Sequence, residues 1–505
     1  MSNNLNIPNL HPSLRDQSLD EQELSGSFKD RFDDFVGSYS RASMMHMAEN
    51  VMVSEGSERD EEDTISTYSS NQRRNSEGTL SEQTPLLPPL SKVDTCQSVM
   101  TVGDSYHTSP QIKKSSFLQS IFNSINILIG VGILSLPLGF KCSGWIISLI
   151  VFCFCFGLTN YTAKLLAKCL DKDPNSRTYG DMGAMAFGVR GRVFISFLFL
   201  TELVTCSVAL VVLLCDGIDS LFPGQNPFLI RVISFVILTP TLFIPIRHLS
   251  YTSLLGILSV FSLFAVIVYD GLSKPNAPGS LHEMEPTATL FPQADSNVPL
   301  SFGLIMAGFA GHAVFPTIYR DMKHPEEYKK MVNFTYIVTA TVYLAVAACG
   351  YAMFGSSTMQ EITQNLVLVP EYNKVLNRMA VYLIALNPIA KYGLTLNPVV
   401  LSWQMSLLPT LESWTNKAKW RKPLVKCIGI LMTSVLIITL ATLIPNFDKV
   451  MSLLGALFSF LISGIFPIFC YLKLFKLGFW ERVMNVILVS IAIVMGTVGT
   501  VKSFI

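Results

Sequence analysis

The stretch NSINILIGVGILSLP, residues 123–137, is apolar enough to lie in a membrane but is poorly suited to a continuous helix. Gly130, Gly132 and Pro137 fall within eight residues of one another. In a helix interior a glycine costs about 1 kcal/mol and a proline about 3 kcal/mol relative to alanine. We therefore predict that the helix containing this stretch is broken near its middle.

A second stretch of this kind, AGFAGHAVFP, occupies residues 307–316. The two stretches lie five predicted spans apart, which is the spacing of an inverted five-plus-five repeat whose discontinuous helices meet at a substrate site. Glycine also permits close packing of continuous membrane helices, so each stretch alone has that simpler explanation. The pair favours a binding site formed by two breaks.

The composition is that of a membrane protein. Of the 505 residues 50% are hydrophobic and 14% are charged, whereas an ordinary soluble domain carries roughly 25% charged residues. A helix needs about 20 apolar residues to cross a hydrocarbon core, and about eleven such segments can be placed. They lie at 117–140, 144–167, 192–215, 228–246, 251–270, 299–318, 332–354, 377–404, 424–444, 447–472 and 483–504. The expected fold class is an all-α polytopic membrane protein with helices 1 and 6 broken.

Charge is unevenly distributed along the chain. Residues 1–110 contain 8 Lys and Arg against 18 Asp and Glu, and the remainder contains 29 against 18. Residues 1–114 are expected to form a disordered cytosolic tail, and residues 115–505 the transmembrane domain. Lys and Arg concentrate in alternate loops of this domain, so the positive-inside rule places the C-terminus in the lumen. The near-neutral, apolar chain argues against a nucleic-acid partner.

One short motif in the tail concerns sorting. Glu82 precedes the pair Leu86 and Leu87 by four residues, which resembles the acidic dileucine peptide that vesicle-coat adaptors read for lysosome or vacuole delivery. Such matches also arise by chance in tails of this composition. The match makes a vesicle-coat adaptor an expected partner of the tail.

A broken helix frees backbone groups that an amino acid can use. The N–H groups of residues 130–133 begin the second half of the first helix, where the helix dipole favours a carboxylate. The carbonyls of Ile129 and Gly308 end the preceding half-helices and can accept from an ammonium group. Phe309 can cover the substrate side chain. Asn126 and the supporting Asn123 lie on nearly the same helix face, so both amides can point into the site or hold the unwound segment. The expected substrate-binding residues are Asn126, Ile129, Gly130, Val131, Gly132, Ile133, Gly308, Phe309 and Gly311.

Ionisable side chains in the middle of predicted spans are candidates for ion coupling, because charges are costly there. Glu202 can carry a proton between an acidic lumen and the cytosol, or can remain protonated and bridge helices. His312 has an ordinary pKa of about 6.5, between the two pH values, or can simply fix the broken helix. In inverted-repeat transporters a coupling cation binds at the broken helices, so in such a fold the ammonium group of Lys391 can replace that cation or neutralise Glu202. Tyr392 and Thr395 are expected to support it.

Four runs of sequence carry a family resemblance: IFNSINILIGVGILSLPLGFKCSGW at 121–145, YGDMGAMAFG at 179–188, GFAGHAVFPTIYRDM at 308–322 and NPIAKYGLTLNP at 387–398. Together they resemble the amino acid/auxin permease family, and within it the fungal vacuolar branch that includes the vesicular inhibitory amino acid transporter. The resemblance covers about residues 115–505. It implies an eleven-helix fold, secondary transport of amino acids and, for the vacuolar branch, exchange against protons.

We therefore expect an amino acid/proton antiporter that moves neutral amino acids by alternating access across a vacuolar or other acidic intracellular membrane. Its partners are an amino acid, protons and membrane lipid. A sodium-coupled plasma-membrane symporter and a transporter-like sensor that signals through its tail remain alternatives. We expect no enzyme activity, cofactor or metal, because no paired carboxylates or metal-ligand cluster recur on facing segments.

Overall fold

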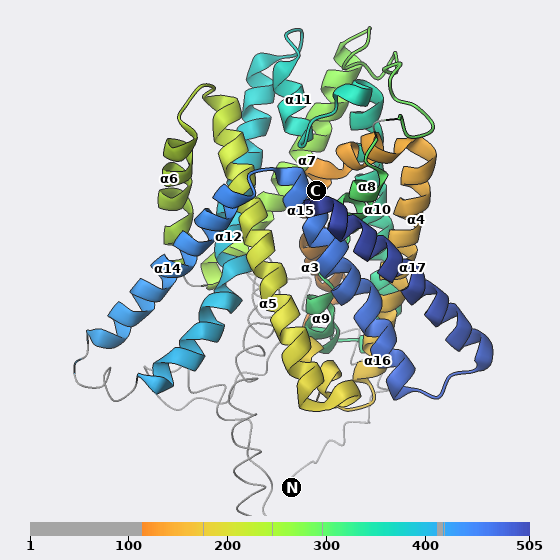
Figure 1. Ribbon diagram of the computed structural model, residues 1–505, viewed down its shortest axis with the longest axis vertical. Helices are drawn as coiled ribbons and strands as arrows, with labels where there is room; N and C mark the ends of the chain where they lie inside the picture. Colours follow the sequence, from red (N-terminus) through yellow and green to blue (C-terminus); the bar gives the residue numbers. More distant parts are fainter. Residues whose placement is uncertain are drawn as a thin grey trace, which may run out of the picture. The chain divides into compact units, whose positions relative to one another are not determined.

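Helices make up nearly all the regular structure that the computed structural model describes, which covers residues 114–504 apart from 175, 245, 295, 412–417 and 419. The expected tail with Glu82, Leu86 and Leu87 lies outside the described residues, except for Lys114. Figure 1 shows the order of the helices. They are α3 (Phe117–Leu128), η1 (Val131–Ser135), α4 (Leu136–Leu170), α5 (Tyr179–Leu221), α6 (Pro227–Leu238), η2 (Thr239–Phe243), α7 (Ile246–Ser273), α8 (Val298–Gly308), η3 (His312–Val314), α9 (Phe315–Asp321), η4 (Pro325–Glu327), α10 (Tyr328–Phe354), η5 (Gly355–Ser357), α11 (Ile362–Leu368), α12 (Lys374–Thr410), α14 (Arg421–Leu443), α15 (Phe447–Leu453), η6 (Leu454–Ile465), α16 (Phe466–Leu474) and α17 (Phe479–Phe504).

The predicted helical membrane fold is confirmed. In the described part of the chain, nine helical stretches are long and apolar enough to cross a membrane, and 117–128 and 227–243 form shorter apolar helices. The stretch 131–170 bends at Gly144, where φ is +69°, so its first part continues the span that α3 begins and the rest forms the next span. Each of the eleven predicted segments therefore falls on helix.

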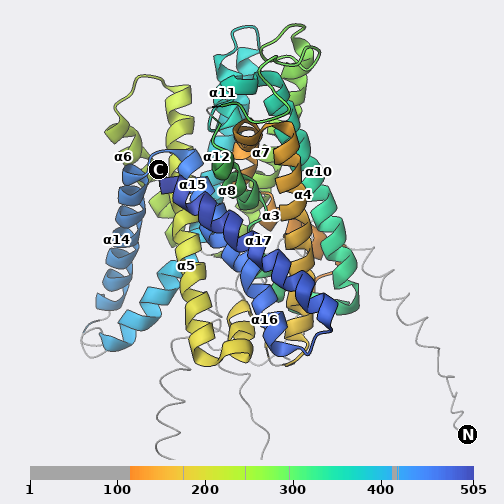
Figure 2. The ribbon, with the colours of Figure 1, turned by 45° about the vertical axis from the view of Figure 1, so that its right-hand side comes forward.

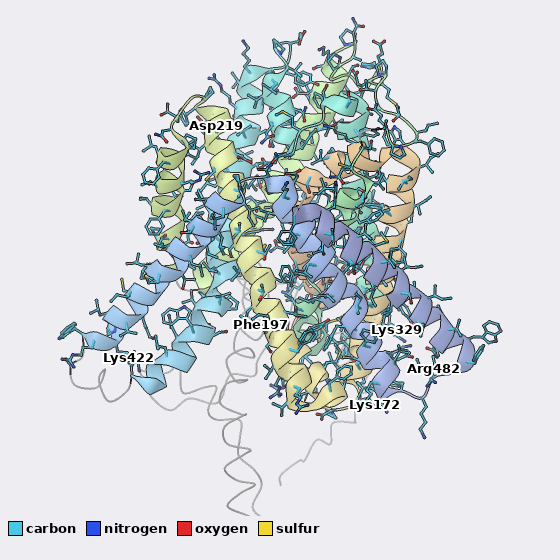
Figure 3. The ribbon with its side chains drawn as sticks, viewed as in Figure 1. Lys172, Phe197, Asp219, Lys329, Lys422 and Arg482 are labelled. Carbon is cyan, nitrogen blue, oxygen red and sulfur yellow. The ribbon has the colours of Figure 1, made fainter. Side chains whose placement is uncertain are left out.

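Basic side chains from separate loops gather toward one end of the helices. Lys172, Lys329, Lys422 and Arg482 lie toward the same end in Figure 3, and Asp219 lies toward the other. All four belong to loops or helix ends that the charge pattern assigns to one side of the membrane. The arrangement fits the alternation of loops that the sequence predicts.

The broken helices pack against long, continuous ones. α10 packs along α4 and α3, α12 packs along α7 and α5, and α8 packs against α4 and η6. In both ribbon views α3 and α8 lie among these helices (Figures 1 and 2). The two breaks therefore lie among α4, α10 and η6, and the flanking residues Ile129 and Phe309 are fully buried.

Candidate functional site

The first break lies where the glycine pattern predicts it. α3 ends at Leu128, Ile129 has φ −73° and ψ 89°, and Gly130 is extended at φ −116° and ψ −160°. The helix resumes as η1 at Val131. A helix that stops leaves its last carbonyls, and the first N–H groups of the next helix, without partners inside either helix. The break therefore presents acceptors and donors within a few residues.

The second break follows α8. The helix ends at Gly308, and η3 begins at His312. Between them Gly311 has φ +121°, a conformation that side-chain-bearing residues rarely adopt. A Cβ atom at Gly311 would also lie only 2.7 Å from Cγ2 of Ile127 on α3. Both the backbone angle and the contact require glycine, which explains why the chain unwinds here.

The two breaks touch through their glycines. A Cβ atom at Gly132 would lie 3.2 Å from both the Cα and the backbone nitrogen of Gly308. Any side chain at residue 132 would therefore push the two half-helices apart. Two stretches that the sequence singles out separately form one backbone-lined region.

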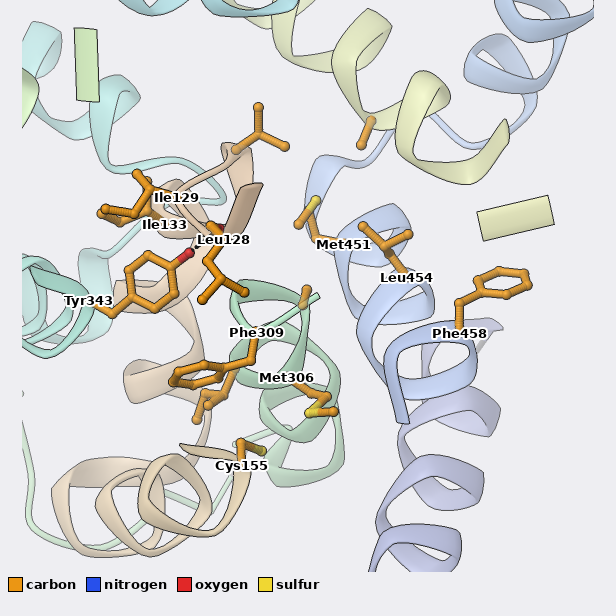
Figure 4. Close-up of a cluster of buried hydrophobic side chains, with 14 of the residues drawn as sticks. Leu128, Ile129, Ile133, Cys155, Met306, Phe309, Tyr343, Met451, Leu454 and Phe458 are labelled. Carbon is orange, nitrogen blue, oxygen red and sulfur yellow. Dashed lines mark hydrogen bonds between the residues drawn. The ribbon is translucent and has the colours of Figure 1, made fainter. Parts of the chain in front are cut away.

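Tyr343 on α10 links the two breaks, and sequence reasoning missed it. Its hydroxyl donates to the carbonyl oxygen of Leu128 and lies 2.8 Å from the carbonyl oxygen of Gly308. Figure 4 shows the ring beside the first break, with its hydroxyl directed at Leu128 and with Phe309 nearby. The side chain is fully buried. A tyrosine in an apolar helix gives no signal of this role, because the two acceptors come from distant segments.

Lys391 on α12 also reaches the first break. Its Nζ atom donates to the carbonyl oxygen of Ile129 at 3.0 Å. Its stem packs on α7, where a Cβ atom at Gly256 would lie 3.1 Å from Lys391 Cε. Thr395 donates to the Lys391 carbonyl at 3.0 Å, within its own helix, and Tyr392 is buried. The structure thus places an ammonium group on the backbone of the broken helix.

Glu202 is a buried carboxyl on α5. The side chain is 6% exposed, and its Oε1 atom has no hydrogen-bond partner among the described residues. It makes no ion pair with Lys391, which points to Ile129 instead. Both Glu202 and Lys391 lie close enough to Cys206 to act electrostatically on its thiol. The two ionisable groups therefore lie near the same thiol without forming an ion pair with each other.

His312 ties the second break to α4 and α10. Its Nε2 atom lies 2.9 Å from the carbonyl oxygen of Thr159, 3.1 Å from Oγ1 of Thr162 and 3.4 Å from the hydroxyl of Tyr336. Its Nδ1 atom is buried with no partner in the part of the chain that is described. A neutral ring that donates from Nε2 to the Thr159 carbonyl satisfies these contacts.

The remaining predicted residues surround the breaks. Asn123 and Asn126 are both buried on α3, 3% and 4% exposed. Phe309 is fully buried, and its ring centroid lies 5.4 Å from that of Phe152 and 5.6 Å from that of Tyr343. An aromatic wall therefore borders the polar backbone region.

Two carboxyl groups from separate segments, Glu361 and Asp216, lie close together. Glu361 precedes α11, is 2% exposed and accepts from the Thr363 hydroxyl at 3.3 Å. Its burial, together with the neighbouring charge of Asp216, raises the pKa of the Glu361 carboxyl well above the ordinary value. Asp216 lies near the end of α5, a position that no sequence pattern connects with residue 361. Across the described residues, no group of three or more His, Cys, Asp or Glu is placed to hold a metal ion.

The fold resembles that of a solved structure. The crystal structure of MhsT in complex with L-phenylalanine matches with a TM-score of 0.51 and 13% sequence identity. The match covers 78% of this chain and 99% of MhsT. At this identity the likeness concerns the fold alone.

Sequence comparison gives the family. Residues 113–505 match the profile of the transmembrane amino acid transporter protein family. Amino acid transporter AVT1D of Arabidopsis thaliana is 32% identical over 411 residues, covering 77% of this chain and 70% of the relative. Amino acid transporter AVT1B of the same organism is 34% identical over 411 residues, with the same two coverages. The chain therefore belongs to the transmembrane amino acid transporter family and is, as the sequence predicts, an amino acid transporter and not an enzyme.

Proposed function

We propose that the protein exchanges neutral amino acids for protons across a vacuolar or other acidic intracellular membrane by alternating access. The substrate binds at the two breaks. The N–H groups of residues 130–133 face its carboxylate, and the carbonyls at the ends of α3 and α8 face its ammonium group. Phe309 and its aromatic neighbours cover the side chain. The contact between Gly132 and Gly308 supports this location, because it brings both sets of backbone groups together.

The hydrogen bond from Lys391 to the Ile129 carbonyl favours proton coupling over sodium coupling, and it is the main observation behind this proposal. A sodium ion in a transporter of this kind binds unwound backbone carbonyls at a broken helix. Here the Ile129 carbonyl already accepts from an ammonium group at 3.0 Å. A positive charge supplied by the protein leaves no need for a bound cation. Glu202, which is buried and has no ion-pair partner among the residues that the structure describes, is the proposed proton carrier.

Orientation and location follow from the charge pattern and the tail. The basic end of the helices faces the cytosol by the positive-inside rule, so the tail is cytosolic and the C-terminus lumenal. The motif at Glu82, Leu86 and Leu87 then faces the cytosol, where a vesicle-coat adaptor can bind it. These points are proposed on the sequence, since the motif lies outside the described residues.

The test uses sealed vesicles containing the purified full chain. Uptake of labelled neutral amino acids is measured with and without an inside-acid pH gradient, in the absence of sodium and ATP. We expect uptake only with the gradient, and its collapse when a protonophore is added. Uptake that requires sodium would contradict the coupling, and the absence of uptake by folded protein would contradict the transport proposal.

A further inference from the structure

Tyr343 has an unusual hydrogen-bonding position. Leu128 and Gly308 are the last residues of α3 and α8, so neither carbonyl has a donor within its own helix. Both carbonyls lie within hydrogen-bonding distance of the same Tyr343 hydroxyl. The backbone N–H of Gly130 also lies within hydrogen-bonding reach of the hydroxyl oxygen, which can accept from it. One side-chain group from α10 therefore serves both broken helices.

The hydroxyl cannot satisfy both acceptors fully. A tyrosine hydroxyl has a single proton to donate, and two carbonyls that converge without enough donors are costly when buried. An ammonium group carries up to three N–H donors and a positive charge, so it can bond both carbonyls at once, and more strongly. The two carbonyls would thus bind a substrate ammonium group more favourably than the hydroxyl, and displacement of the hydroxyl would free the Gly130 N–H for the substrate carboxylate.

The ring is held in place from several sides. A Cβ atom at Gly308 would lie 3.0 Å from Tyr343 Cε2, so the ring packs directly on the backbone of the second break. Phe309 contacts the ring edge to face, with centroids 5.6 Å apart. The hydroxyl can leave the carbonyls only if these contacts shift, which links its displacement to movement of α8 against α10.

We propose that the Tyr343 hydroxyl occupies the ammonium subsite in the substrate-free transporter and that the substrate displaces it. This inference rests on the proposed location of the substrate at the breaks, and its second test, which measures exchange alone, does not depend on proton coupling. Two consequences follow. The hydroxyl stabilises the empty site, so it matters whenever the transporter changes orientation without substrate. The substrate must bring at least two N–H donors to replace it.

The first test separates net uptake from exchange in proteoliposomes containing the full chain. Labelled L-leucine, L-phenylalanine, L-glutamine and glycine are used separately. Net uptake is driven by an inside-acid gradient, and exchange is measured without a gradient against the same unlabelled amino acid inside. In Tyr343→Phe we expect net uptake to fall by on the order of tenfold, the effect of one net hydrogen bond. Exchange should persist, because in exchange a new substrate binds the site on each side before the transporter changes orientation, so the empty site never has to reorient.

The matched control is Tyr328→Phe, which removes a fully buried hydroxyl that donates to the Ala163 carbonyl at 3.1 Å on the same helix α10. Tyr328→Phe should not lower net uptake more than it lowers exchange. Equal loss of exchange and net uptake in Tyr343→Phe, or loss of neither, would overturn the inference while leaving the transport proposal intact. Wild-type protein that moves no probe in either assay would overturn both.

A second test needs no variant, so it does not depend on the folding of Tyr343→Phe. N-methyl-L-leucine and N,N-dimethyl-L-leucine are compared as inhibitors of labelled L-leucine exchange by wild-type protein. As zwitterions they carry two N–H donors and one, respectively. We expect inhibition by the first and a loss of inhibition by the second. Equal inhibition by both compounds would overturn the requirement for two donors.

Discussion

The ammonium group of Lys391 lies 3.0 Å from the carbonyl oxygen of Ile129, across 262 residues of sequence. The bond joins α12 to the end of α3 at the point where the first helix unwinds. It gives the breaks a fixed positive charge near the proposed substrate. Ammonium donors from the protein and from the substrate would thus bind adjacent carbonyls of the same break.

Replacing Lys391 tests whether this charge substitutes for a coupling cation. A hydrogen bond from a charged group contributes about 1.5–3 kcal/mol, so Lys391→Ala should lower gradient-driven uptake by roughly 10- to 100-fold. If the ammonium group replaces an ion, sodium should restore part of the uptake by the variant. The measurement is uptake in sodium and in choline medium. Lys374→Ala, on an exposed residue of the same helix, is the control. Unchanged uptake by Lys391→Ala would contradict the assignment.

Gly256 on α7 is expected to set the position of Lys391. A methyl group at residue 256 would lie 3.1 Å from Lys391 Cε, close enough that the lysine stem must move by a few tenths of an ångström. We expect Gly256→Ala to have a small effect and Gly256→Val to lower uptake strongly, because a larger side chain pushes the ammonium group off Ile129. Gly157→Val is the control, since nothing lies within 4 Å of a Cβ atom there. An equal loss of uptake in Gly256→Val and Gly157→Val would contradict the steric argument.

The pair of Glu361 and Asp216 predicts a pH-dependent stability. The pKa of Glu361 is raised in the folded state by burial and by Asp216, so folding favours its protonated form. The stabilisation is fully present below the ordinary pKa of glutamate, about 4.3. It is lost as the pH rises through the folded-state value.

Thermal unfolding of the purified protein should therefore show a lower unfolding temperature as the pH increases through this window. Glu361→Gln mimics the protonated group, so its unfolding temperature should be higher than that of wild type at neutral pH and should depend less on pH. Glu371→Gln, at an exposed residue whose carboxylate pairs with Lys274, is the control. The same slope in wild type and Glu361→Gln would contradict the prediction.

The fold was predictable because its causes are local. Apolar length places the spans, and Gly130, Gly132 and Gly311 make a continuous helix unfavourable at the breaks. The side chains that contact the breaks could not be predicted in this way. Tyr343 is one of several tyrosines on an apolar helix, and its two carbonyl acceptors are 215 and 35 residues away. No spacing rule connects such residues before the helices are packed.

The charged candidates could likewise be identified from the sequence, but their contacts could not. Their low number in apolar segments identifies Glu202 and Lys391 from sequence, but their relative position depends on the packing of α12 on α5. Lys391 was expected either to replace a cation or to neutralise Glu202, and the structure places it on Ile129. Glu361 and Asp216 were not connected at all, since the short helix α11 reaches the end of α5 only through the tertiary fold.

Glu202 provides the most direct test of proton coupling. Its Oε1 atom has no partner among the described residues, so Glu202→Gln should fit the site without loss of a hydrogen bond to that atom. The amide cannot take up or release a proton. We expect gradient-driven uptake to fall to the level seen without a gradient, whereas exchange without a gradient should stay within about twofold of wild type, the range of a neutral substitution. Glu283→Gln, at an exposed carboxyl, is the control. If Glu202→Gln keeps its response to the gradient, the carboxyl has a structural role, and His312, a buried titratable group at the second break, becomes the residue to replace.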